Sequence, residues 1–175
     1  LADSKPQRVF ASGGQAVNFL DFEKDGKKSD IEGHSFVTID YSNGVRATVA
    51  LNMFCPDFYE ELVICGDEGR LLACERVDLQ QMKAPDASVS VYLGKQGASR
   101  TTKLGYPAAI EKSGHHGATY YEHSAFLDRL EGKLVDSATP LQGLWAMIVA
   151  SAAQESIATG NPIEIAQYID LHKLA

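Results

Sequence analysis

Five histidines are the side chains best suited to acid–base chemistry in this 175-residue sequence. His115 and His116 stand together just before a predicted helix, and loops that lead into helices often carry binding residues. We therefore expect His115 or His116 to face a substrate; the alternative is that their rings bond only to backbone groups. His34 and His172 are expected at the surface. No HExxH or paired CxxC spacing occurs, so no metal site is predicted.

The segment DFYEE, residues 57–61, is the second candidate because it combines aromatic rings with carboxylates, as sugar-binding surfaces do. Its position predicts a turn before a hairpin, where functional residues are frequent, although the same pattern also suits the start of a strand. Tyr59 is the substrate-binding candidate in this segment. No GxSxG elbow is present, so a hydrolase triad is not supported.

Two glycine clusters, Gly13-Gly14 and Gly66 to Gly69, are the only candidates for holding a phosphate. Neither fits GxGxxG, neither lies between a strand and a helix, and no P-loop occurs. We interpret them as turn glycines. The chain by itself is therefore expected to bind no nicotinamide cofactor.

Strand patterns fill the first two-thirds of the chain and helical patterns fill the last third, which predicts an α+β fold. The strand candidates outside the hairpins are Arg8 to Val17, Ser88 to Gly94, Arg100 to Leu104 and an edge strand from Pro162 to Ile165. Residues 25–30 are predicted to form a polar loop.

A hairpin from Ser35 to Phe54 is the clearest local signal, because apolar and polar residues alternate on both sides of Ser42-Asn43-Gly44. A two-residue loop would place apolar rows opposite polar ones. A three-residue loop places Tyr41 opposite Val45 and matches the apolar rows. It also puts Gly44 at the left-handed position of the turn.

A second hairpin, with the loop Asp67-Glu68, is predicted to be apolar on both of its faces. One face carries Leu62, Ile64, Leu71 and Ala73, and the other carries Val63, Cys65, Leu72 and Cys74. Because one layer of helices covers one face only, we expect an open, largely antiparallel (mixed) sheet with helices on one face and self-association through the other. The alternative cover for the second face is a lid formed by residues 77–103.

Two helices are predicted after residue 118. The first is expected to begin with a capping box at Thr119 and Glu122 and to end at Gly132. The second is expected to begin at Thr139-Pro140 and to stop at Gly160.

Composition excludes several classes of function. A net charge of −7 and a pI of about 5.2 disfavour nucleic acid and anionic membrane surfaces as partners. The three cysteines are odd in number and lack CxxC spacing, which favours a reducing, cytoplasmic location without disulfides. The length predicts a single domain, 1–175, and because the first residue is not methionine we expect a cut chain.

The order of five segments is similar to that of a known family. The segments are PQRVFASGG, DIEGHSFVTIDYSNGVRATVALNMF, EELVICGDEGRLLA, HHGATYYEHSAFLDRLEGK and TPLQGLWAMIVASAAQESIATGNPIEI. Together they resemble, over nearly the whole chain, the C-terminal domain of the glucose–fructose oxidoreductase, inositol dehydrogenase and rhizopine-catabolism (Gfo/Idh/MocA) family.

The resemblance implies an NAD(P)-dependent oxidoreductase that acts on a sugar, polyol or related hydroxyl compound and assembles as a dimer or tetramer through its sheet. It also implies that NAD or NADP is bound by an N-terminal Rossmann domain. This chain carries no EKP motif, no DxGxH motif and no GxGxxG, so that domain and the catalytic residues are expected to lie outside it.

By family position, Tyr59, His115 and His116 are implied to orient substrate hydroxyls, with no catalytic residue in this chain. We expect the chain alone to be inactive. The alternative is a non-catalytic binding or assembly module that uses the same sheet to dimerise.

Overall fold

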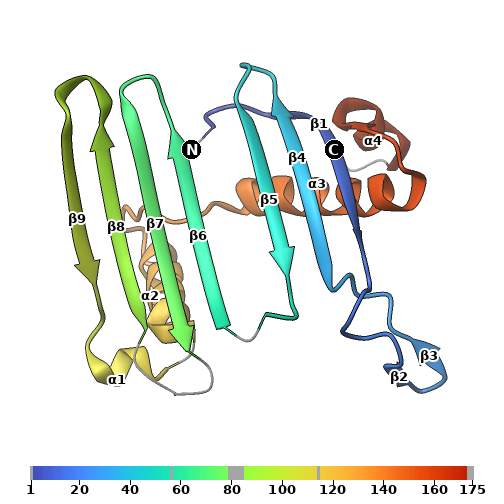
Figure 1. Ribbon diagram of the computed structural model, residues 1–175, viewed down its shortest axis with the longest axis horizontal. Coiled ribbons are helices and arrows are strands. Elements are labelled where there is room, and N and C mark those ends of the chain that lie inside the picture. The colour runs from blue at the N-terminus through green and yellow to red at the C-terminus, as the bar shows by residue number, and fades with distance from the viewer. Residues whose placement is uncertain (1, 56, 79–84, 114, 173–175) are drawn as a thin grey trace. The chain divides into compact units, whose positions relative to one another are not determined.

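The computed structural model describes residues 1–175 except 1, 56, 79–84, 114 and 173–175 (Figure 1). In chain order the elements are β1 (Pro6–Gly14), β2 (Glu23–Lys24), β3 (Lys27–Lys28), β4 (His34–Tyr41), β5 (Arg46–Asn52), β6 (Asp57–Cys65), β7 (Gly69–Asp78), β8 (Asp86–Leu93), η1 (Gly94–Gln96), β9 (Ala98–Leu104), α1 (Ala108–Glu111), η2 (His115–Gly117), α2 (Ala118–Leu130), α3 (Pro140–Thr159), β10 (Ile163–Glu164) and α4 (Ile165–His172). Helices and antiparallel sheets confirm the α+β prediction.

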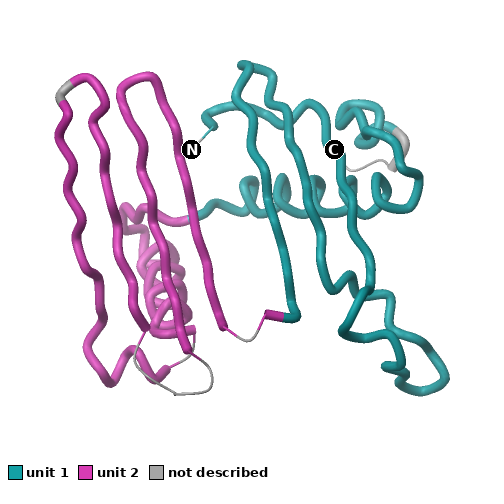
Figure 2. The backbone as a smooth tube through the Cα atoms, viewed as in Figure 1, with its two compact units in different colours: residues 1–54, 138–175 teal, residues 55–137 magenta. Residues whose placement is uncertain are grey.

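The chain divides into two compact units, residues 1–54 with 138–175 and residues 55–137 (Figure 2). In the first unit the sheet order is β10-β1-β4-β5, and all three pairings are antiparallel. The buried face of this sheet packs on α3 and α4, with Val9 and Ala152 fully buried and Ile165 nearly so. Successive side chains of a strand point to opposite faces of the sheet. Because Val9, Ala11 and Val37 are buried against the helices, Phe10 and Phe36 are exposed on the outer face.

The predicted edge strand at 162–165 is confirmed as β10. The first strand is shorter than predicted, because β1 ends at Gly14 instead of Val17. There the chain leaves the sheet, and the Gln15 side-chain amide donates hydrogen bonds to the carbonyls of Ser29 and Ile31. The predicted polar loop at 25–30 is also partly wrong, since residues 23–28 form the small β2–β3 hairpin.

The register predicted for the first hairpin is confirmed. Ile39 pairs with Ala47, and the Tyr41 N–H donates to the Val45 carbonyl at 2.9 Å. Gly44 closes the three-residue loop with a φ of +86°, and its N–H donates to the Tyr41 carbonyl. Residues with a Cβ are strongly disfavoured in that left-handed region, so this position of the turn favours glycine.

Replacement of Gly44 by alanine is expected to lower the free energy of unfolding by ~1 kcal/mol, because alanine is strained at positive φ. No atom lies within 4 Å of a Cβ built at this position, so the effect should come from backbone strain alone. Urea unfolding of the two proteins measures it. Gly143→Ala, in the first turns of α3 and equally open, is the matched control and should not destabilise.

In the second unit the sheet is an antiparallel meander in the order β6-β7-β8-β9. The second predicted hairpin is confirmed, since Ile64 pairs with Leu71 and Leu62 with Ala73. Residues 57–61 were expected in a turn, which is wrong: β6 starts at Asp57 and pairs with β7 along its whole length. The lid is also wrong, because β8 and β9 extend the sheet sideways by hydrogen bonding instead of covering its face.

Helix α3 begins as predicted at Thr139-Pro140, and a capping box joins Thr139 and Gln142 at its first turn. It is followed by Gly160 in the left-handed conformation, as predicted. The capping box expected at Thr119 is wrong, because η2 runs directly into α2 and the N-cap is Gly117 without a side-chain bond. In the part of the chain that the structure describes, no helix is long and apolar enough to span a bilayer.

Candidate functional site

His116 lies on η2 and points to the β6–β7 strands of the same unit. Its Nδ1 hydrogen-bonds a carboxylate oxygen of Glu75, and its ring meets the Phe58 ring edge-on with centroids 5.6 Å apart. The His116 and Glu75 side chains are 32% and 30% exposed, so the pair is half-buried and still accessible to solvent. A carboxylate on one imidazole nitrogen fixes the ring's orientation and leaves the other nitrogen for a ligand.

The other ring nitrogen of His116, Nε2, has no hydrogen bond to any residue that the structure describes. With Nδ1–H donated to Glu75, a neutral ring presents Nε2 as an acceptor, and a protonated ring presents it as a donor. A substrate hydroxyl can both give and accept a hydrogen bond, so it fits Nε2 in either state. His115, the other candidate on this turn, is exposed and shows no such partner among the described residues.

The backbone of this turn adopts three positive φ angles in succession, +42° at His115, +53° at His116 and +102° at Gly117. Such conformations are costly for residues with a Cβ and persist only where surrounding contacts hold them. A Cβ on Gly117 would lie 2.9 Å from Cδ2 of Tyr106 and 3.2 Å from Cγ2 of Ile110. Glycine is therefore required at position 117 for two reasons: the positive φ, and the close approach of the Tyr106 ring.

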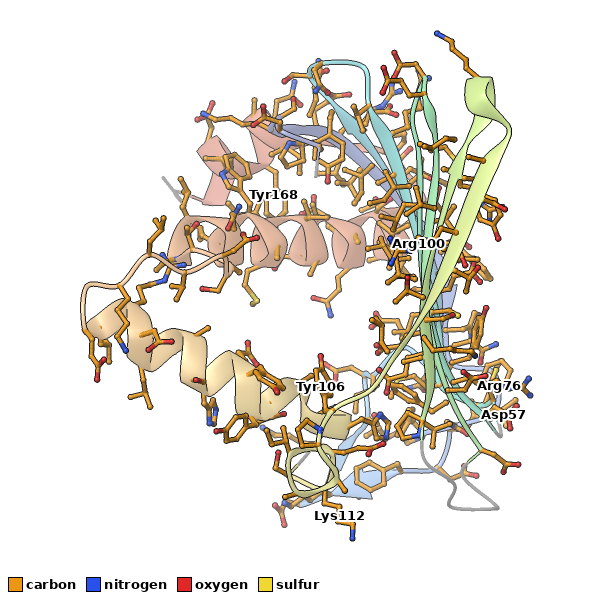
Figure 3. The ribbon with its side chains drawn as sticks, turned by 90° about the vertical axis from the view of Figure 1, so that its left-hand side faces the viewer. Asp57, Arg76, Arg100, Tyr106, Lys112 and Tyr168 are labelled. Carbon is orange, nitrogen blue, oxygen red and sulfur yellow. The ribbon has the colours of Figure 1, made fainter. Side chains whose placement is uncertain are left out.

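Three tyrosines gather beside this turn. Tyr106 comes from the segment between β9 and α1, and Tyr120 and Tyr121 come from the first turn of α2. Ring centroids are 4.8 Å apart for Tyr106 and Tyr121 and 5.4 Å apart for Tyr120 and Tyr121. Figure 3 shows Tyr106 at the end of α2, on the side of the β6–β9 sheet that carries the helices.

Tyr59 lies on the opposite face of the same sheet. It pairs with Arg76, whereas the neighbouring pair Phe58 and Val77 faces the His116 turn. The Tyr59 hydroxyl donates to the Glu61 carboxylate at 2.6 Å, and this hydrogen bond raises the pKa of the phenol. The structure therefore does not bring Tyr59 and His116 together.

Around Tyr59 this opposite face is charged at one end. Arg76 donates to Asp57 at 2.5 Å, which raises the pKa of the guanidinium, and Lys103 pairs with Asp86. Figure 3 shows Asp57 and Arg76 pointing away from α2. This part of the face is a ladder of alternating charges across four strands, in which Arg76, Asp86 and Lys103 are exposed and Asp57 is half-buried.

The remaining histidines do not join the site. His34, expected at the surface, is half-buried at the start of β4, with its Nδ1 covered and its ring edge-on to Phe54 at 6.0 Å. His123 is exposed on α2, and His172 is the last residue of α4. The described residues contain no group of three metal-ligating side chains.

The described residues do not fit a nicotinamide dinucleotide. Such a cofactor takes a glycine-rich turn that joins a strand to a helix N-terminus. Here Gly13-Gly14 ends a strand that leads into a loop, and Gly66 and Gly69 belong to the β6–β7 hairpin. Among the residues that the structure describes, neither glycine turn can therefore hold the phosphates of the dinucleotide.

Three solved structures of similar fold are oxidoreductases. Levoglucosan dehydrogenase in complex with NADH matches with a TM-score of 0.63 and 16% identity over 92% of this chain and 45% of its own. An oxidoreductase from Agrobacterium radiobacter, in complex with NAD+, L-tartaric acid and magnesium, has a TM-score of 0.57 and 14% identity over 93% and 44%. Aldose–aldose oxidoreductase from Caulobacter crescentus, complexed with glycerol, has a TM-score of 0.55 and 14% identity over 92% and 42%.

The TM-scores show a common fold, and the chain spans less than half the length of each of the three proteins. No curated protein matches the sequence. A family profile, described as "Oxidoreductase family, C-terminal alpha/beta domain", matches residues 3–165. The resemblance inferred from the order of the five segments is thereby confirmed: the chain belongs to the Gfo/Idh/MocA oxidoreductase family, as its C-terminal α/β domain.

Proposed function

We propose that this chain is the substrate-side and oligomerisation domain of an NAD(P)-dependent oxidoreductase acting on a sugar, polyol or related hydroxyl compound. The family supports the reaction class, and three relatives of similar fold were solved with NADH, with NAD+ and L-tartaric acid, or with glycerol. Because no described element fits a dinucleotide, we assign the cofactor, the catalytic residues and a Rossmann domain to sequence outside this chain. The same assignment makes the isolated chain inactive, and its free cysteines favour a cytoplasmic location.

The His116–Glu75 pair is the observation that carries the substrate-side role. It is a polar pair in a half-buried position, held by a backbone in a costly conformation, with Nε2 left for a ligand. Strained backbone and oriented imidazoles are concentrated at functional sites. We assign hydroxyl binding to His116, with Glu75 as its positioning residue, and His115 and Tyr59 are left as weaker candidates.

The oligomerisation role is supported by exposed apolar rows on both sheets. In the first unit, Phe10 and Phe36 are 44% and 58% exposed on the outer face. Next to them runs a row of alternating charges across all four strands, Glu164, Arg8, Asp40 and Arg46. The Arg8 guanidinium lowers the pKa of Asp40 through their hydrogen bond, so the row stays charged. Apolar patches rimmed by charge are typical of interfaces.

Binding of small polyols by the 175-residue chain tests the substrate-side role. Replacement of His116 by alanine is expected to weaken binding of both sorbitol and myo-inositol about tenfold, because one hydrogen bond to the ligand is lost. Glu75→Gln should weaken both ligands less, because Nε2 is kept and the amide oxygen still accepts from Nδ1–H, but without the negative charge that strengthens this hydrogen bond. NMR titration at millimolar ligand, with the histidine ring protons followed, measures these changes.

His123→Ala, an exposed histidine on α2, is the matched control and should leave both affinities unchanged. Equal binding by wild type and His116→Ala would contradict the assignment. Self-association without any binding of hydroxyl compounds would favour the second candidate, a non-catalytic assembly module, which the exposed apolar rows also support.

A further inference from the structure

We propose that Asn43 is a site of spontaneous deamidation, and that its conversion to aspartate or isoaspartate releases the N-terminal segment, residues 2–5, from the first hairpin. The modification is covalent and lies in the first unit, so it goes beyond the proposed function and does not depend on it. The change runs in one direction only, because the ammonia that leaves is lost to solvent.

The dipeptide Asn43-Gly44 has the chemistry for this reaction. The backbone nitrogen of Gly44 attacks the side-chain Cγ of Asn43, and a five-membered succinimide forms. The proton of that nitrogen and the amide group leave together as ammonia. Water then opens the ring at either carbonyl, which gives aspartate or isoaspartate. A glycine nitrogen is the least hindered attacking group, because no Cβ crowds the ring as it closes.

The side chain of Asn43 is already folded back over the glycine. The residue is exposed in the loop, and its Oδ1 accepts a hydrogen bond from the Val45 N–H at 3.2 Å. This bond closes an Asx turn, which brings the side-chain carbonyl across the Gly44 peptide. An N–H group on Oδ1 also stabilises the negative charge that this oxygen acquires when Cγ is attacked.

Two other hydrogen bonds slow the reaction in the folded chain. The Gly44 N–H donates to the Tyr41 carbonyl at 3.0 Å, and Nδ2 of Asn43 donates to the Ala2 carbonyl at 2.9 Å. The attack breaks the first bond, and the departure of ammonia breaks the second. The rate of deamidation is therefore set by how often the N-terminal segment lifts away from the turn.

The N-terminal segment is held to the turn by further hydrogen bonds. The Asn43 N–H donates to Ser4 Oγ at 3.3 Å, the Ser42 N–H donates to the Lys5 carbonyl at 3.1 Å, and the two serine hydroxyls bond at 2.8 Å. Deamidation replaces the Nδ2 donor by a carboxylate oxygen, so two acceptors face each other at the Ala2 carbonyl. Isoaspartate also lengthens the backbone of the turn by a methylene group. Both products therefore weaken the attachment of the segment.

Release of the segment uncovers a mostly apolar cavity of the first unit. The cavity has a volume of about 720 Å³, and residues 2–4 line it together with Trp145 of α3 and residues of β4 and β5. Lys5 Nζ lies 5.9 Å from the centre of the Trp145 ring. Because Trp145 is the only tryptophan in the sequence, its fluorescence reports whether the segment is in place.

The test is incubation of the 175-residue chain at mildly alkaline pH, followed by peptide mapping with mass spectrometry. Asn52 is the internal control. It is also exposed, its Oδ1 accepts from the Phe54 N–H at 3.1 Å, and the following N–H, that of Met53, donates to the Gly33 carbonyl at 2.8 Å. Asn43 is expected to deamidate at least about tenfold faster than Asn52, because only Asn52 is followed by a bulky residue.

Two variants test the link to the N-terminal segment. Ser4→Ala leaves Asn43 and Gly44 intact and should speed deamidation about fivefold, because the segment opens more often. Asn43→Asp has the product's side chain and should shift Trp145 fluorescence to longer wavelength and speed hydrogen exchange of the Ser42 amide. Asn52→Asp adds the same charge to the same unit and should change neither signal.

Each part of the proposal has its own contrary result. Deamidation of Asn43 no faster than that of Asn52 overturns the modification site. Unchanged Trp145 fluorescence and Ser42 exchange, both in Asn43→Asp and in the aged chain purified by ion exchange, overturn the release. If circular dichroism shows that Asn43→Asp does not fold, the aged chain alone decides. A wild-type rate in Ser4→Ala overturns control of the reaction by the segment.

Discussion

Replacement of Ser156 by alanine is expected to lower the free energy of unfolding of the chain by about 2 kcal/mol, a large effect for the removal of one hydroxyl group. Ser156 is fully buried on α3. Its Oγ accepts a hydrogen bond from the Ala11 N–H at 2.9 Å and donates one to the Asn161 carbonyl at 2.7 Å. Because β10 pairs with β1 only at residues 8 and 9, the serine takes the place of a strand partner for Ala11.

Removal of the hydroxyl leaves the buried Ala11 N–H without a partner in the core of the first unit, whereas Asn161 is exposed, so that its carbonyl can bond water instead. Each buried, unpaired group costs about 1–3 kcal/mol, and the helix propensity gained by alanine, about 0.5 kcal/mol, offsets only part of this. Urea unfolding monitored by circular dichroism measures the change. Ser151→Ala, on the same helix and half-buried, should change stability by less than about 0.5 kcal/mol. A loss below about 1 kcal/mol for Ser156→Ala would contradict the argument.

Elements specified by local patterns were predictable from the sequence. In the first hairpin, the strict alternation around Ser42-Asn43-Gly44 admits one register that keeps apolar residues together, and the structure has that register. In α3, Thr139-Pro140 and Gly160 mark both ends, because capping and positive φ depend on neighbouring residues only. The small β2–β3 hairpin was missed although Asp25-Gly26, with φ angles of +53° and +75°, is a strong turn signal.

The residues at which β6 and α2 begin are set by tertiary contacts and could not be predicted from local sequence. Asp57 to Glu61 alternates in polarity too weakly to indicate a strand, and its pairing with β7 decides the matter. Thr119 has capping-box spacing, but the left-handed Gly117 already ends the preceding turn and becomes the N-cap. In both cases a partner elsewhere in the fold outweighs local preference.

The site was only partly predictable for a similar reason. His115 and His116 were recognised as a pair on a loop, but Glu75, the partner of His116, lies 41 residues earlier in the middle of a strand. No spacing rule links a strand glutamate to a distant histidine, and Tyr106 likewise joins the site only through Gly117. Tyr59 was grouped with the histidines by family position, whereas the period-two alternation of β6 places it on the face of the sheet opposite His116.

Self-association of the chain through the β6–β9 sheet is the second prediction with a large expected effect. The face that carries Tyr59 also carries Val63 and Tyr92, which are 42% and 41% exposed, and Leu72 between them. Among the described residues of this unit only Val77 is a buried apolar side chain, so the sheet has little core of its own. Covering such a face would gain about 25 cal/mol for each Å² of apolar surface removed from water.

Val63→Asp is expected to weaken the dimer about 100-fold or more, because an uncompensated carboxylate would be buried at the contact. Leu72→Asp should have the same effect. Sedimentation equilibrium measures the association, and circular dichroism checks that each variant is folded.

Leu62→Asp is the matched control. Leu62 is 47% exposed on the opposite face of the same strand, the face of Phe58 and the His116 turn, so its replacement should leave the dimer intact. If Leu62→Asp dissociates the dimer and Val63→Asp does not, the contact lies on the helix-bearing face, where it would compete with a ligand at His116. A wild-type chain that remains monomeric at its highest soluble concentration would exclude sheet-mediated association, and the exposed row would then require a different partner.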